Sequence, residues 1–137
     1  MAFENDYIMR IIHEMVRTLL KLLFNIDEEK TEPASLTEEA GTSGYGKLKK
    51  LAGEGRINEA ENLLYDFLDE NGTENRENLK TALLFYDFLN TFDSDYLESH
   101  DFSREEIRSG IENVLSMFGY TGLTDALSIS ALDETQG

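Results

Sequence analysis

Two segments of this chain nearly repeat each other, and this repetition constrains the fold more than any other feature. Leu63–Asp69 reads LLYDFLD, and Leu84–Asn90, which starts 21 residues later, reads LFYDFLN. Each segment holds the apolar residues of about two helical turns. The intervening Asn71–Thr73 consists of residues that favour turns. We therefore expect two helices that pack antiparallel around one core, and an all-α fold.

Length and composition indicate one small globular domain. The chain has 137 residues, of which 40% are hydrophobic and 10% aromatic. This is enough for one core and too little for two. The absence of cysteine excludes disulfides, thiolate nucleophiles and thiolate metal sites. The first apolar segment lacks the layout of a signal peptide, so we expect a cytoplasmic protein.

The net charge of −16 is large for a chain of this size. A strongly acidic surface repels phosphate backbones, so we expect no nucleic-acid partner. The concentrated positive charge at Lys47, Lys49 and Lys50 is too small to change that expectation. A basic protein partner or a cationic ligand is compatible with the charge.

The first helix is expected over residues 6–25, with Asn5 or Asp6 as its N-cap. Its apolar residues follow a spacing typical of a coiled-coil seam: Ile8, Ile12, Met15, Leu19, Leu22 and Ile26. A second apolar row widens this stripe: Ile11, Val16, Leu20 and Leu23. So broad a face leaves two alternatives open, because the helix either lies deep in the core or also pairs with another subunit.

Pairing of this helix with a second copy of the chain would make the protein a homodimer. The candidate interface then consists of Ile8, Ile12, Met15, Leu19 and Leu22. Charged residues such as Arg10 and Lys21 interrupt the same segment and exclude a membrane-spanning helix. Glu14 and the net charge oppose peripheral attachment to anionic lipid, so we expect no stable membrane association.

Composition divides the chain into four regions. Residues 1–26 form the amphipathic N-terminal helix, and residues 27–46 are an acidic linker of small residues that we expect to be flexible. A helical core domain is expected over 47–119. The C-terminal tail, 120–137, is weakly patterned and has one possible short helix, from Thr124 to Leu132.

Apolar periodicity and capping residues predict the helices of the core domain. We expect a short helix at 45–52 and a longer one at 58–70 that ends before Gly72. The next helix begins after Thr73 or Asn75, and its centre is apolar on nearly every side, which is typical of a central helix.

Two further elements complete an irregular bundle of five or six helices. Residues 95–98 are expected to form one helical turn. The residues Ser103–Glu106 match a capping box, which predicts the start of a last helix that Gly119 ends.

The segment Leu48–Leu68 reads LKKLAGEGRINEAENLLYDFL. It resembles one tetratricopeptide helix pair, with Gly55 at the turn and Ala60 at the close-packing position of the second helix. The match departs from that pattern at Gly44 and Leu48, and no second copy follows at the repeat period. The resemblance implies a tetratricopeptide-like hairpin and not a peptide-binding superhelix.

The whole chain is similar to an uncharacterised family of short, acidic, all-helical bacterial proteins. The residues that carry this resemblance are Asn5–Arg10 (NDYIMR), Met15–Arg17 (MVR) and Leu22–Phe24 (LLF). The resemblance implies a shared fold and no particular activity.

Two patterns suggest metal sites but do not satisfy metal chemistry. His13–Arg17 reads HEMVR and begins like the zinc-binding pattern HExxH, but a permanent cation stands where the second histidine is required. The acids near residue 97 lack the spacing of an EF-hand loop: Asp93, Asp95, Glu98 and Asp101. We interpret them as helix caps, with weak cation binding left open. We expect no metal and no cofactor.

The repeated Tyr-Asp pairs are the candidate ligand cleft: Tyr65, Asp66, Tyr86 and Asp87. Two carboxylates held face to face would act as acid and base. Alternatively, each Asp points outward, and each Tyr lies at the rim of the core with its hydroxyl in water.

These observations predict a non-enzymatic interaction or regulatory module that self-associates through its N-terminal helix. The alternative is a small-ligand-binding protein or enzyme that uses the acidic and tyrosine side chains between the central helices. The first hypothesis predicts that removal of residues 1–26 abolishes the dimer and leaves the other helices folded.

Overall fold

The computed structural model describes residues 2–25, 45–69, 73 and 76–123, with side chains from Tyr7 onward. In this part of the chain the protein is all-α, with six helices and no strands. The helices are α1 (Ala2–Phe24), α3 (Tyr45–Gly53), α4 (Ile57–Asp69), α5 (Arg76–Leu89), α6 (Ser94–Ser99) and α7 (Arg104–Met117). The expected all-α bundle of five or six helices is confirmed.

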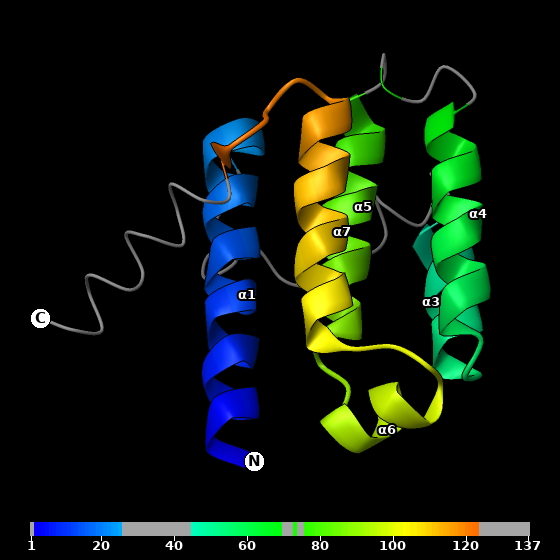
Figure 1. Ribbon diagram of the computed structural model, residues 1–137. Helices are drawn as coiled ribbons and strands as arrows, with labels where there is room; N and C mark the ends of the chain where they lie inside the picture. Colours follow the sequence, from blue (N-terminus) through cyan, green and yellow to red (C-terminus); the bar gives the residue numbers. More distant parts are fainter. Residues whose placement is uncertain (1, 26–44, 70–72, 74–75, 124–137) are drawn as a thin grey trace, which may run out of the picture.

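The bundle is arranged around α5. In Figure 1, α1, α7, α5 and α4 stand side by side, with α5 behind α7 and the short α6 below them. Helix α5 contacts α1, α3, α4 and α7. Every residue from Leu79 to Tyr86 is buried, which confirms that this helix is central. Because other helices surround α5, consecutive residues of α5 face different neighbours. This arrangement determines which side chains of α5 meet in the candidate site.

Helix α1 packs in the core of the same chain. It contacts α5 and α7. Its buried residues are Ile12, Met15, Val16, Leu19 and Leu20. Three residues of the candidate dimer seam therefore lie in the core and offer no surface to a partner in this structure. Of the other two, Ile8 is partly buried and Leu22 is 63% exposed.

Helices α3 and α4 form a closely packed hairpin. Gly55 lies in the turn between them with φ of +85°, a conformation that glycine adopts without strain. A Cβ atom at this position would lie 2.5 Å from Nε2 of His100, which follows α6. The hairpin thus exists, although nothing in the structure identifies it as a tetratricopeptide unit.

Helix α7 begins as its capping residues predict. Ser103 is the N-cap, and its Oγ accepts a hydrogen bond of 3.2 Å from the backbone N–H of Glu106. The buried face of the helix consists of Ile107, Gly110, Ile111, Val114 and Leu115 together with Arg104. Gly119 follows with φ of +91°, as expected for a helix-terminating glycine.

Other predicted element ends differ from the structure or lie outside it. The N-cap prediction of Asn5 or Asp6 is wrong, because α1 already begins at Ala2. Helix α3 begins at Tyr45, as the expected helix at 45–52 predicts, and the last two residues of the expected linker therefore belong to this helix. The rest of that linker, the helix end at Gly72, the cap at Asn75 and the tail beyond residue 123 lie outside the described residues.

Candidate functional site

The structure separates the four residues of the predicted cleft. Asp66 is exposed on α4. Asp87 faces α1, where its Oδ1 lies 2.9 Å from Nδ1 of His13. Tyr65 and Tyr86 do meet, with their hydroxyl oxygens 3.5 Å apart. The two tyrosines therefore share a site, whereas the two carboxylates point to different surroundings and do not form an acid–base pair.

Helix rotation explains this separation. Neighbouring residues on a helix differ by about 100° in direction. On α5, Tyr86 therefore faces α4 and α7, and Asp87 faces α1. The prediction that Tyr86 lies at a wet rim is wrong, because Tyr86 is 0% exposed.

The two tyrosines belong to a hydrogen-bonded group that we call the tyrosine cluster: Glu61, Tyr65, Tyr86 and Asn113. The hydroxyl of Tyr86 donates to Oε2 of Glu61 at 2.7 Å. Nδ2 of Asn113 donates to the hydroxyl of Tyr65 at 3.0 Å. The cluster joins α4, α5 and α7 through side chains.

The absence of a side chain at Gly110 of α7 leaves room for the ring of Tyr86. A Cβ atom on Gly110 would lie 2.3 Å from Cζ of Tyr86 and 2.5 Å from its hydroxyl oxygen. Any side chain there would displace the ring. An isolated glycine inside a helix costs about 1 kcal/mol relative to alanine, and close packing of this kind offsets that cost.

Above the cluster lies a hollow of about 510 Å³ between α4 and α7. Its lining residues are Glu61, Tyr65, Glu106, Ser109, Gly110 and Asn113. A second hollow of about 540 Å³ adjoins it and shares Glu106 and Ser109. The carboxylates of this second hollow come from α6, α7 and the turn between them: Glu98, Asp101, Glu105 and Glu106. We call the two hollows together the acidic face.

The surroundings of Glu61 change its electrostatics. Burial raises the pKa of Glu61 above its ordinary value, the hydrogen bond from Tyr86 opposes this rise, and the charge of Glu106 adds to it. Burial and then the charge of Glu61 raise the pKa of Tyr86, so this phenol keeps its proton and remains a donor.

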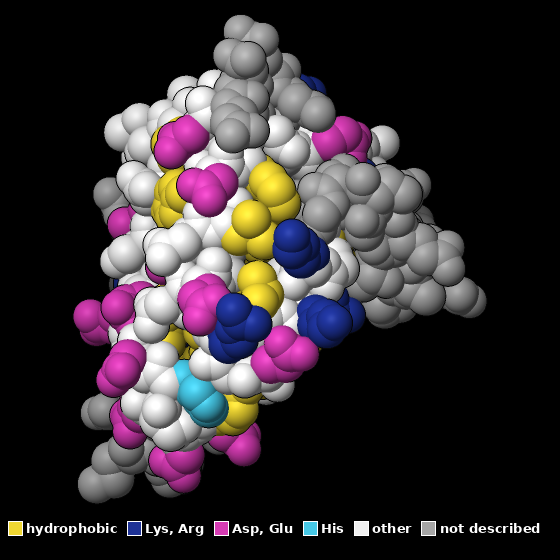
Figure 2. Space-filling model, turned by 90° about the vertical axis from the view of Figure 1, so that its right-hand side faces the viewer, with side chains coloured by type: hydrophobic (Ala, Val, Ile, Leu, Met, Phe, Trp, Pro, Cys, Tyr) yellow, Lys and Arg dark blue, Asp and Glu magenta, His cyan; other side chains and the backbone are white. Residues whose placement is uncertain are grey.

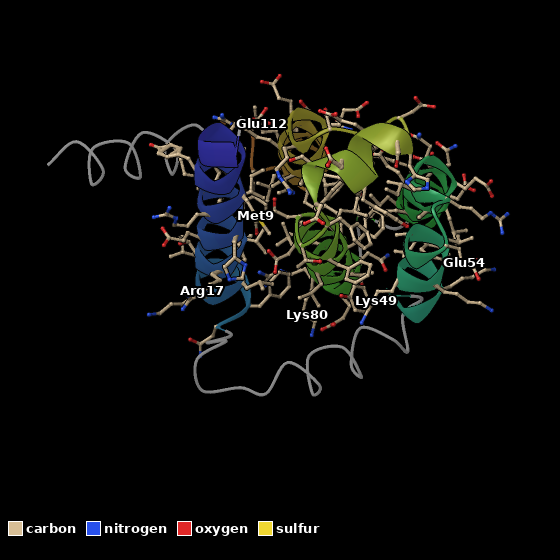
Figure 3. All side chains as sticks on the ribbon, turned by 90° about the horizontal axis from the view of Figure 1, so that it is seen from below. Met9, Arg17, Lys49, Glu54, Lys80 and Glu112 are labelled. Atoms are coloured by element: carbon tan, nitrogen blue, oxygen red, sulfur yellow. The ribbon has the colours of Figure 1, made fainter. Side chains whose placement is uncertain are left out.

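A second polar group lies on another side of α5, between α1 and α3. Besides the His13–Asp87 contact, it includes Tyr45, whose pKa is raised by burial and then by the charge of Asp87. Nζ of Lys49 lies 5.5 Å from the ring centre of Tyr45 and 5.1 Å from that of Phe88. Figure 3 shows Lys49 and Lys80 on this same side of the bundle. These contacts tie α1 and α3 to the central helix.

A third group is buried near the end of α5. Nη1 of Arg104 donates to the backbone oxygen and to Oδ1 of Asn90, at 2.9 and 3.1 Å. Nδ2 of Asn90 in turn donates to the backbone oxygen of Met9 at 2.8 Å. Because its donors satisfy backbone carbonyls, we assign this group a structural role.

Sequence reasoning missed Glu61, Glu106, Gly110 and Asn113. One signal was available, because Gly110 interrupts an otherwise regular helix and an isolated helix glycine indicates close packing. Glu61 and Tyr65 are four residues apart and therefore share one face of α4. Nothing local indicated that α7 would lie opposite that face.

The described residues hold no group of three or more His, Asp or Glu side chains placed to bind a metal ion. Within the same part of the chain, no helix is long and apolar enough to cross a membrane. Figure 2 shows the molecule from the right-hand side of Figure 1, with acidic side chains spread over the surface and a few Lys and Arg among them.

Comparison with known proteins adds a family and no activity. No curated protein matches the chain. No solved structure matches it. The model of a family of unknown function, DUF6483, matches residues 2–119, and the chain therefore belongs to that family.

Proposed function

We propose that this protein is a non-enzymatic interaction module that binds a basic segment of a partner protein on its acidic face. The observation that carries the proposal is the pair of adjoining hollows. Together they present five carboxylates, Glu61, Glu98, Asp101, Glu105 and Glu106, and no Lys or Arg is among the residues that line them. A cytoplasmic location belongs to the same proposal.

The physical argument is charge complementarity. Carboxylates gathered on one surface raise the local concentration of cationic groups and speed their association. They also discriminate against acidic partners, for which like charges are costly. Both hollows are shallow, which suits an extended or helical segment laid along α7.

A labelled hexa-arginine peptide tests this proposal by fluorescence anisotropy at several salt concentrations. The variant Glu98→Gln/Glu105→Gln removes two carboxylates from the acidic face. Its matched control is Asp66→Asn/Asp69→Asn, which removes two exposed carboxylates from α4. An exposed ion pair contributes about 0.2–1 kcal/mol, so the loss of two carboxylates should weaken binding about twofold to thirtyfold in the first variant.

The control should bind the peptide nearly as tightly as the parent chain. Equal weakening by both variants would show that the peptide senses only the net charge, and the proposal would then fail.

Self-association through α1 is the second part of the proposal, and it needs a new geometry. Because the middle of the seam is buried in the chain, contact between copies would use the outer end of α1 around the exposed Leu22 or an exchange of α1 between two copies. Light scattering of the parent chain and of Leu22→Ser over a range of concentrations tests this. A monomer at every concentration would exclude self-association.

The alternative function, a small-ligand-binding protein or enzyme, also has one supporting observation. Tyr65 and Tyr86 do come together with a carboxylate, Glu61, beside a hollow. The ligand chemistry that suits this hollow is taken up next.

A further inference from the structure

The hollow over the tyrosine cluster has a defined construction. Glu61 and Tyr65 lie four residues apart on α4, and Glu106, Gly110 and Asn113 occupy one face of α7. Both helices contact α5, and Tyr86 of α5 lies beneath them, against Gly110. Three helices therefore hold the polar groups of this hollow in place.

The side chain of Glu61 is partly buried and has no cationic partner among the described residues. Its partner in the structure is the hydroxyl of Tyr86, at 2.7 Å. Glu106 lines the same hollow, and its like charge raises the pKa of Glu61 further. A partly buried carboxylate next to a second carboxylate is stabilised by a bound cation, which relieves both the desolvation and the repulsion.

The available hydrogen-bonding groups select the kind of cation. The carboxylates of Glu61 and Glu106 and the hydroxyl of Ser109 offer acceptors toward the hollow. Guanidinium and alkylammonium groups carry donors only, so they match such a set. Hard metal ions require six or more oxygen ligands, and the described residues provide no such group here.

We propose that this hollow anchors a single basic side chain, the guanidinium of Arg or the ammonium of Lys, from the partner segment. The charged head lies between Glu61 and Glu106. Its aliphatic stem runs out of the hollow past Tyr65, which covers it on one side. This inference rests on the proposed function, and it adds the position on the acidic face where the partner is held.

The test uses two small probes, methylguanidinium and n-propylammonium, and follows backbone amide signals by NMR. Binding in the hollow should shift the signals of Ser109, Gly110 and Asn113. A hydrogen bond to a charged group corresponds to about tenfold in affinity. We therefore expect about tenfold weaker binding for Glu61→Gln and for Glu106→Gln.

Glu105→Gln is the matched control, because it removes the same charge from the neighbouring residue of α7, which lines only the second hollow. It should leave the binding of the probes nearly unchanged. Glu61→Gln keeps an oxygen acceptor for Tyr86, and Glu106→Gln does not touch the tyrosine cluster, so one of the two reports on binding even if the other perturbs the fold.

Two results would overturn the inference: no shift at Ser109 to Asn113 in the parent chain, or equal weakening by Glu105→Gln. The hexa-arginine peptide separates this inference from the proposed function. If Glu61→Gln does not weaken binding of the peptide, the hollow is not the anchor, and the acidic face remains the proposed docking surface. If the small probes bind but the peptide does not, the cation site is supported and the proposed function is refuted.

Discussion

The substitution Gly110→Ala gives the most direct test of the packing around the tyrosine cluster. The added Cβ would lie 2.3 Å from Cζ of Tyr86 and 2.5 Å from its hydroxyl oxygen. Tyr86 is fully buried and hydrogen-bonded to Glu61, so movement of its ring disturbs the packing around it. Either the ring shifts and its hydrogen bond to Glu61 breaks, or α7 moves away from α5.

The expected magnitude follows from three contributions. Overpacking of a core costs about 1–3 kcal/mol. Loss of a hydrogen bond to a charged group costs about 1.5–3 kcal/mol. Replacement of glycine by alanine inside a helix raises the free energy of unfolding by about 1 kcal/mol. We therefore expect Gly110→Ala to lower the free energy of unfolding by about 1.5–5 kcal/mol.

Urea denaturation followed by circular dichroism at 222 nm (the standard helix signal) measures this change. Gly46→Ala is the matched control, because Gly46 is exposed on α3 and no atom lies within 4 Å of its added Cβ. The control should be neutral or slightly stabilising. The substitution Tyr86→Leu shortens the colliding side chain, so Gly110→Ala should cost less in that background than in the parent chain.

A neutral or stabilising Gly110→Ala would refute this reasoning, since it would mean that Tyr86 does not lie against α7. An equal cost in the parent and Tyr86→Leu backgrounds would also refute it, because the collision would then not be the cause.

Four further predictions concern other parts of the molecule. Arg104→Met leaves buried backbone carbonyls without a donor and should lower the free energy of unfolding by at least about 1.5–3 kcal/mol in urea denaturation, whereas the exposed Arg108→Met should change it little. His13→Ala removes a half-exposed contact to Asp87 and should cost about 0.5–1.5 kcal/mol, a loss that a double-mutant cycle with Asp87→Asn should assign to this pair. Burial raises the pKa of Glu61, so the folded chain holds the proton of this carboxyl group more tightly than the unfolded chain does. The free energy of unfolding should therefore fall as the pH rises from about 4.3, the ordinary pKa of Glu, toward the raised pKa of Glu61. The variant Glu61→Gln should lack this part of the fall. Deletion of residues 1–26 should unfold the chain, contrary to the expectation from sequence, because α1 fills the core; a folded and cooperative remainder in circular dichroism would contradict this.

Local sequence signals predicted the helices well because helix formation depends on near neighbours. The apolar run of α5 indicated a central helix, and its burial on all sides confirms this. The hydroxyl of Ser103 accepts a hydrogen bond from the backbone N–H of Glu106 within one turn, so the start of α7 was predictable from the chain alone. The α1 start was missed, since Asn5 and Asp6 are good caps that the helix extends beyond.

The candidate site was only half predictable. The repeated Tyr-Asp pair drew attention to Tyr65 and Tyr86, which do meet. The same repeat suggested that Asp66 and Asp87 would meet as well, and they do not. Equal local sequences give equal helices, but the direction of each side chain depends on where the helix lies in the bundle.

Local patterns along the chain were therefore sufficient to predict the fold class, the central position of α5, the capped start of α7 and the acidic character of the protein. These properties depend on composition and on contacts within a few residues along the chain. The packing of the helices was needed to learn that α1 lies in the core, that Asp87 faces His13, and that α7 brings Glu106 and Gly110 opposite Glu61. These contacts join residues far apart in the chain, so they depend on the rotation and position of whole helices, which local periodicity does not encode.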